Sequence, residues 1–212
     1  MGKNRRNSSR PMPRSFGDLL REQLPGVMII AGITFVLAIV VSLVTEYFLR
    51  SITSLLIAFF ILLIIILIGV LFDAIGVAVA VAQEPPFHAK AADRVRGASE
   101  ALQLIRRADR VASFCNDVVG DVCGTISGAI GATIALRLLF IRPSWSELLA
   151  AVIMTGLIAA TTVGGKALGK TFAINQAHKI MFGVGRTLAW WGYLTGWSIA
   201  MGDRKGQKRK TR

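Results

Sequence analysis

The chain has 212 residues, of which 53% are hydrophobic and 17% are charged, with a formal net charge of +13 and a mean hydropathy of +0.58. This composition is too apolar for an ordinary soluble domain and predicts a polytopic membrane protein with room for about four spans. The positive charge does not indicate nucleic-acid binding, because the basic residues flank apolar runs as in a positive-inside topology, without an aromatic-basic module or zinc spacing.

The N-terminal part of the chain predicts a tail and two spans. Residues 1–26 are basic and contain proline, which predicts a cytoplasmic tail with a short amphipathic lead-in. Apolar runs then predict spans at about 27–47 and 53–82. The inner end of the second run changes character, because Asp73 and small residues replace leucine and isoleucine. Residues 83–86 end this helix, since paired prolines cannot continue it.

The C-terminal part predicts two more spans and two surface helices. A basic, amphipathic pattern predicts a helix at 88–111 on the inner membrane surface, where anionic headgroups attract its arginines. Spans are predicted at about 112–139 and 147–165, which completes a transmembrane domain ending near residue 170. A juxtamembrane amphipathic helix with interfacial tryptophans at 171–201 and a basic tail at 202–212 follow.

The stretch from Ile180 to Met201 could alternatively form a fifth span interrupted by Arg186. Charge decides between these readings. With four spans, all of the 25 Lys and Arg lie on the cytoplasmic side except Arg50, Arg137 and Arg142, whereas a fifth span would export the basic tail. The sequence therefore predicts an all-α, four-span protein of the cell (inner) membrane with both termini in the cytoplasm.

The segment from Ser113 to Gly131 carries the clearest candidate for a site. As an α-helix it places two carboxylates, Asp117 and Asp121, on a seam of glycines. An isolated charge in hydrocarbon costs about 3 kcal/mol or more, so these acids must be neutralised, paired or coordinated. The seam predicts close approach of another helix at three glycines: Gly120, Gly124 and Gly128.

A third acid is predicted at the same depth in the membrane, because Asp73 lies about as far from the inner end of its span as the other two. Carboxylate and amide oxygens suit a hard cation such as Mg²⁺. The residues therefore predict a metal site with these ligands: Asp73, Asn116, Asp117 and Asp121. The structural alternative is that an acid pairs with a basic residue at the inner surface: Arg94, Arg110 or Lys166.

Catalysis has little support. The patterns GxSxG, HExxH and the phosphate-binding loop are missing, and a nucleophile at Ser113 or Cys115 would need a base that the spacing does not provide. We therefore expect no enzyme. Cys115 and Cys123 lie too far apart on one helix for a disulfide and are interpreted as small packing residues, and His88 is interpreted as a surface or capping residue.

Three stretches follow one another in a recognisable order: Phe72 to Val79 in a span, Gly97 to Ile105 in the basic surface helix, and Gly165 to Thr171 at the end of a later span. With this order the chain from Leu71 to about Leu188 resembles the transmembrane domain of the cyclin-M/CorC (CorB-like) magnesium transporters. The resemblance implies binding and transport of a divalent cation and a homodimer. An unidentified cytosolic regulatory partner is a further expectation.

The chain also departs from the family pattern. Gly76 and Lys166 stand where the family has glutamates, and the paired CBS domains that follow in the family are expected to be absent. The family's ion-site serines therefore cannot be carried over, and Asp73 with the acids of the central helix is expected to form a replacement site. The alternative is a non-transporting scaffold or regulator in which the intramembrane acids form structural salt bridges.

Overall fold

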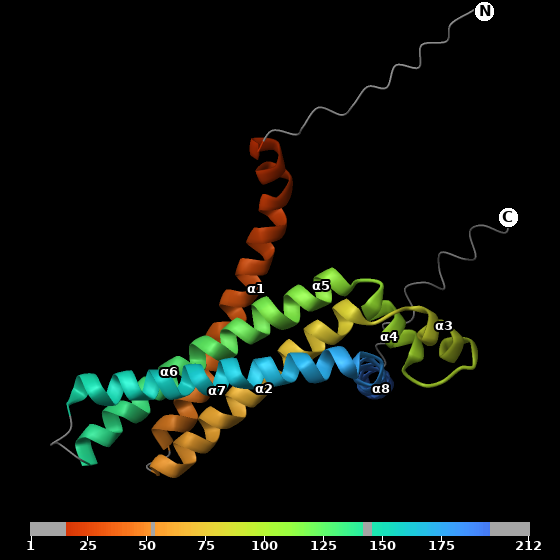
Figure 1. The fold of residues 1–212 in the computed structure, drawn as a ribbon. Helices are drawn as coiled ribbons and strands as arrows, with labels where there is room; N and C mark the ends of the chain where they lie inside the picture. The colour runs from red at the N-terminus through yellow and green to blue at the C-terminus, as the bar shows by residue number, and fades with distance from the viewer. Residues whose placement is uncertain (1–15, 52–53, 142–145, 196–212) are drawn as a thin grey trace, which may run out of the picture.

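The computed structural model describes residues 16–51, 54–141 and 146–195, and all regular secondary structure in these ranges is helical (Figure 1). Four segments in the described ranges are long and apolar enough to cross a membrane. They lie in helix α1 (Phe16–Ser51), in helix α2 (Leu55–Val81), in the continuous segment Ala108–Ile141, and in helix α7 (Glu147–Asn175). The chain is therefore a multi-pass membrane protein.

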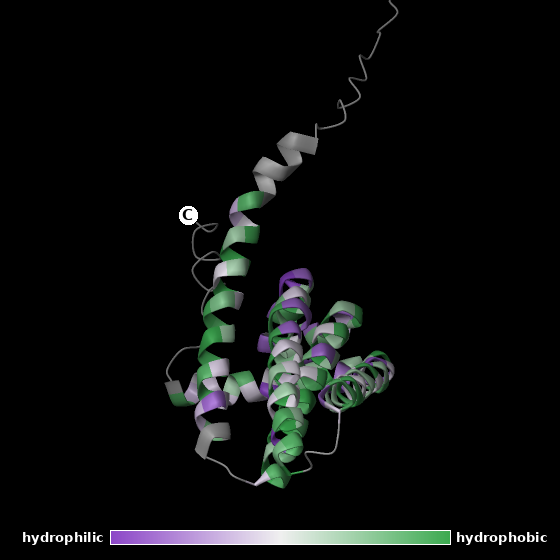
Figure 2. Ribbon diagram, turned by 90° about the vertical axis from the view of Figure 1, so that its left-hand side faces the viewer, coloured by the Kyte–Doolittle hydropathy of each residue, from purple (hydrophilic) through white to green (hydrophobic). Residues whose placement is uncertain are grey.

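The outward faces of these helices are apolar as well. Large side chains such as Phe60 and Leu63 of α2 and Leu148 of α7 are exposed on the surface of the bundle. Figure 2 shows hydrophobic residues on most of the long helices. Such a surface would be costly in water, whereas the acyl chains of a bilayer cover it at no cost.

The core of the bundle lies between α2, helix α6 (Asp121–Ile141) and α7. Leu62 and Ile66 of α2 pack with Ile126 and Ile130 of α6 and with Met154 of α7. Because lipid tails are as apolar as these side chains, the association depends on close van der Waals packing rather than on removal of water.

Among the described side chains of α1, those that pack on this core lie in its C-terminal half. Leu37, Ala38 and Val41 pack on the core, and Thr45 is buried. The N-terminal half rises away from the bundle in both views (Figures 1 and 2). The predicted lead-in and the predicted first span form one helix in the structure, and Pro25 lies inside this helix. Residues 1–15 of the predicted tail lie outside the described ranges.

The predicted surface helix at 88–111 is divided into α3 (Pro85–Ala92), α4 (Ala98–Ile105) and α5 (Ala108–Ser113). Prolines occupy the first positions of α3, where their missing N–H is not needed, so this helix begins three residues earlier than predicted. Between α3 and α4 the chain turns through two residues with positive φ, Arg94 at 55° and Gly97 at 87°. An uninterrupted helix cannot contain these conformations.

The last described helix, α8 (Ala177–Thr195), begins where α7 ends. The predicted fourth span stopped at 165, whereas α7 continues to Asn175 and breaks at Gln176. Figure 1 shows α8 end-on, beside α3 and α4 at one end of the bundle. Among the described helices α8 is not one of the candidate spans, and Trp190 is 63% exposed. Trp197 and the predicted 202–212 tail are outside the described ranges.

Candidate functional site

The central segment does not begin as the α-helix that the sequence predicts. Residues Phe114–Gly120 form a π-helix, η1, which runs directly into α6. A π-helix closes its hydrogen bonds over five residues, so the faces before and after it no longer follow one 3.6-residue period. Gly120 is buried in the resulting arrangement, whereas Asp117 and Asp121 are exposed. Short π-helical segments of this kind occur frequently at functional sites.

Asp73 of α2 is the buried acid of this region, with 5% of its surface exposed. The ammonium nitrogen of Lys166 lies 3.8 Å from Oδ1, and that of Lys170 lies 3.9 Å from Oδ2. Both separations are within the range of an ion pair but are too long for a hydrogen bond. The lysine side chains are 25% and 52% exposed, so both can also reach water. The carboxylate is thus flanked by two positive charges supplied by the chain itself.

Lys166 also touches the π-helix. A Cβ placed on Gly120 would lie 3.6 Å from its Nζ, so the ammonium sits between α2 and η1. Close approach of α7 to α2 makes this reach possible, because a Cβ on Gly165 or Gly169 would lie 3.0 or 3.2 Å from Val70. Lys166 therefore brings α2, η1 and α7 together at one level of the bundle.

The side chain of Asn116, in η1, also packs against α2. Its side chain occupies the space that a Cβ on Gly76 would need, so only glycine fits there. Three buried oxygens have no hydrogen-bond partner among the described residues: Asp73 Oδ2, Asn116 Oδ1 and Thr162 Oγ1. Each unpaired buried group costs about 1–3 kcal/mol.

The sequence places the Thr162 hydroxyl of α7 close to the predicted depth of the three acids, although Thr162 is not one of the four predicted metal ligands. Neighbouring hydroxyls donate to a carbonyl four residues earlier, as Thr161 does to Leu157 O at 2.8 Å. The hydroxyl of Thr162 has no such partner within the described ranges. A sequence signal exists, because Thr162 precedes Lys166 by one helical turn and therefore shares its face.

The two acids of the central helix lie on an exposed face. Asp117 accepts a hydrogen bond of 2.6 Å from Ser113 Oγ, and Asp121 is exposed at the point where η1 runs into α6. In the described ranges no group of three or more His, Cys, Asp or Glu side chains is placed to hold a metal ion. The magnesium site with four ligands stays a prediction. Of its predicted ligands, Asp73 is buried, whereas Asp117 and Asp121 are exposed.

The predicted glycine seam is likewise divided. Gly120 is buried, but a Cβ on Gly124 or Gly128 would meet nothing within 4 Å in the described structure. The tight contacts of the bundle lie elsewhere. They are at Gly69 and Gly76 of α2, at Gly131 of α6, and at Gly165 and Gly169 of α7. The four-residue spacing of the last two is the small-xxx-small pattern that could have indicated them from the sequence.

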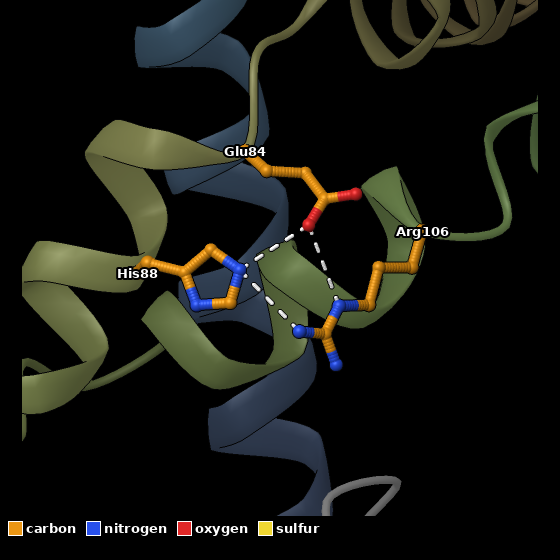
Figure 3. Close-up of polar contacts among 3 residues, drawn as sticks. All are labelled: Glu84, His88 and Arg106. Atoms are coloured by element: carbon orange, nitrogen blue, oxygen red, sulfur yellow. Dashed lines mark hydrogen bonds and ion pairs between the residues drawn. The ribbon is translucent and has the colours of Figure 1, made fainter.

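A second polar cluster lies on the surface, where Glu84, His88 and Arg106 meet (Figure 3). His88 Nε2 lies 3.2 Å from Glu84 Oε2, and the Arg106 guanidinium lies 3.5 Å from the same oxygen and 3.3 Å from the imidazole. All three residues are exposed or half-exposed, so the contacts are worth at most about 1 kcal/mol. The cluster joins the start of α3 to the end of α4 and agrees with the interpretation of His88 as a surface residue.

No family model matches this chain, and the comparisons with curated proteins and with solved structures also gave no match. The resemblance to the cyclin-M/CorC transporters stays a prediction that rests on residue patterns alone.

Proposed function

We propose that the chain is a non-enzymatic, non-transporting scaffold or regulatory protein of the membrane, in which the buried acid forms a structural salt bridge. The observation that carries this proposal is the placement of Asp73 beside the ammonium groups of Lys166 and Lys170, at 3.8 and 3.9 Å. These groups supply more positive charge than one carboxylate needs. A bound metal ion is therefore not required to neutralise the acid.

Electrostatic repulsion supports the same conclusion. Two unit charges 4 Å apart interact by about 4 kcal/mol at an effective dielectric constant of 20, so a divalent ion would repel each nearby ammonium by about 8 kcal/mol. A divalent ion could occupy the position beside Asp73 only after both lysines had moved away. The arrangement thus favours the resident ammonium groups over Mg²⁺.

The test uses the full chain purified in detergent and reconstituted in liposomes. We expect no change in the unfolding temperature at millimolar Mg²⁺, and no Mg²⁺ entry into dye-loaded liposomes above that of protein-free liposomes. Protection by Mg²⁺ that disappears in Asp73→Asn, together with Mg²⁺ flux, would contradict the scaffold proposal.

A second candidate function is binding and transport of a divalent cation such as Mg²⁺ across the cytoplasmic membrane. It is favoured by the three unpartnered buried oxygens on α2, η1 and α7 and by the resemblance to magnesium transporters. Here Lys166 and Lys170, which are partly exposed, would withdraw to water when the cation binds. Asp73→Asn and Asp121→Asn should then abolish Mg²⁺ protection while expression is unchanged, and Lys166→Met should strengthen it.

The proposal includes a cell-membrane location with both termini in the cytoplasm. It is supported by the even number of candidate spans and by the clustering of basic residues at the ends that this topology places inside. Fusions of a periplasm-active phosphatase and of a fluorescent protein to the C-terminus test it. Phosphatase activity without fluorescence would reverse the orientation.

A further inference from the structure

Helix α8 carries positive charge that no acid of its own helix balances. The sequence contains no Asp or Glu between residues 148 and 202, so α8 has no carboxylate to pair with its cations. The two lysines of α7 have a partner in Asp73 of α2. Lys179 and Arg186 of α8 form no ion pair with any carboxylate that the structure describes. An anion that neutralises them must therefore come from elsewhere.

The fold fixes α8 against the turn between α3 and α4, and Figure 1 shows these helices side by side at one end of the bundle. The buried ring of Phe87 stacks on the imidazole of His178, with 5.8 Å between the ring centroids. Gly97, which precedes α4, touches Gly185 of α8 through the backbone, and a Cβ on either glycine would collide with the other segment. The side chains around these contacts thus have firmly placed backbones.

Both sides of this junction are basic. The Lys90 Nζ of α3 lies 4.4 Å from the centroid of the Phe182 ring of α8, and the Arg186 Cζ lies 6.0 Å from the same centroid. Arg96 immediately precedes Gly97, which lies against the backbone of Arg186. These three exposed cations, Lys90, Arg96 and Arg186, are called the basic cluster below. Bringing like charges together costs electrostatic energy, which a bound anion would relieve.

The acids of the same segment do not neutralise the basic cluster. Glu84 contacts His88 and Arg106 instead. Asp93, in the turn between α3 and α4, forms no ion pair within the described part of the chain. A phosphate group suits such a set of cations, because a guanidinium offers paired donors to its oxygens and a lysine adds a mobile ammonium. The aromatic ring of Phe182 holds both kinds of cation beside it.

We propose that the basic cluster is a binding site for a phosphate group, carried by the headgroup of an anionic phospholipid or by a soluble phosphate compound. The exposed Trp190 lies one helical turn beyond Arg186, and tryptophans of this kind are typical of a membrane interface. The site goes beyond the proposed function and does not depend on whether the chain transports an ion. It is also more specific than a general attraction of basic helices for anionic headgroups, which depends on the number of charges and not on which of them is removed.

The test uses the full chain in a neutral detergent. Native mass spectrometry measures the binding of phosphatidylglycerol, and the unfolding temperature at constant ionic strength measures the binding of glycerol phosphate, its soluble headgroup. We expect saturable binding of at least one of them. Binding of the lipid without glycerol phosphate identifies a headgroup site, whereas binding of glycerol phosphate that displaces the lipid identifies a site for the phosphate group itself.

Lys90→Gln and Arg186→Gln should each raise the dissociation constant about fivefold or more. The matched control is Arg107→Gln, which removes the same charge from an exposed position between α4 and α5 and should leave the constant nearly unchanged. Unfolding temperatures without phosphate separate loss of the site from loss of the fold. Arg96→Gln is a second variant, because in the described structure Arg96 makes no contact with the Phe182 ring.

Two results overturn the proposal. One is the absence of saturable binding of both phosphatidylglycerol and glycerol phosphate. The other is a control variant that weakens binding as much as the variants of the basic cluster do, because the attraction would then be spread over all the basic residues of this surface.

Discussion

Removing both lysines that flank Asp73 is the sharpest perturbation of the buried salt bridge. Lys166 and Lys170 approach different oxygens of the carboxylate at nearly the same distance, 3.8 and 3.9 Å, so each can replace the other. We expect Lys166→Met or Lys170→Met alone to cost at most about 1 kcal/mol. The double variant leaves a carboxylate that is 5% exposed without a counter-charge, which should cost about 3–5 kcal/mol.

Reversible unfolding of the full chain in mixed micelles measures these free energies. The control is Lys179→Met, which removes the same charge from an exposed position on α8 and should change stability by less than about 0.5 kcal/mol. Adding Asp73→Asn to the double variant removes the stranded charge and should restore most of the lost stability. The reasoning would be refuted if the free-energy costs of the two single substitutions summed to the cost of the double substitution. It would also be refuted if the triple variant were as unstable as the double variant.

The remaining predictions concern close contacts and use the same unfolding assay. Gly76→Ala collides with the Asn116 side chain and should cost about 1–3 kcal/mol, most of which Asn116→Ala in the same chain should restore; a neutral Gly76→Ala would contradict the contact. Gly185→Ala meets the backbone of α4, which cannot yield, and should cost about 3 kcal/mol or more. The control is Gly183→Ala, whose added methyl group points into open space on α8 and should stabilise the chain by about 0.5–1 kcal/mol. Stability changes of the same sign at Gly183 and Gly185 would be inconsistent with this packing. His88→Ala should cost less than about 1 kcal/mol, and a larger loss would show that the surface cluster is structurally essential.

Several features follow from the sequence because they depend only on neighbouring residues. Long apolar runs predict the four spans, since crossing the bilayer requires about 20 apolar residues whatever surrounds them. Pro85 and Pro86 end the second span for an equally local reason, as proline lacks the N–H that a continuing helix needs. The basic residues of the C-terminal tail favour four spans, because a fifth span would export them.

The partners of the polar residues depend on how the helices are rotated about their axes and how closely they approach, and residue spacing does not determine either. The π-helix turns Asp117 and Asp121 to an exposed face that a uniform helical period does not predict. Approach of α7 through Gly165 and Gly169 is what brings Lys166 to Asp73. The acids and lysines could thus be identified from the sequence as residues that need partners, but only the packing of three helices decided which of them meet.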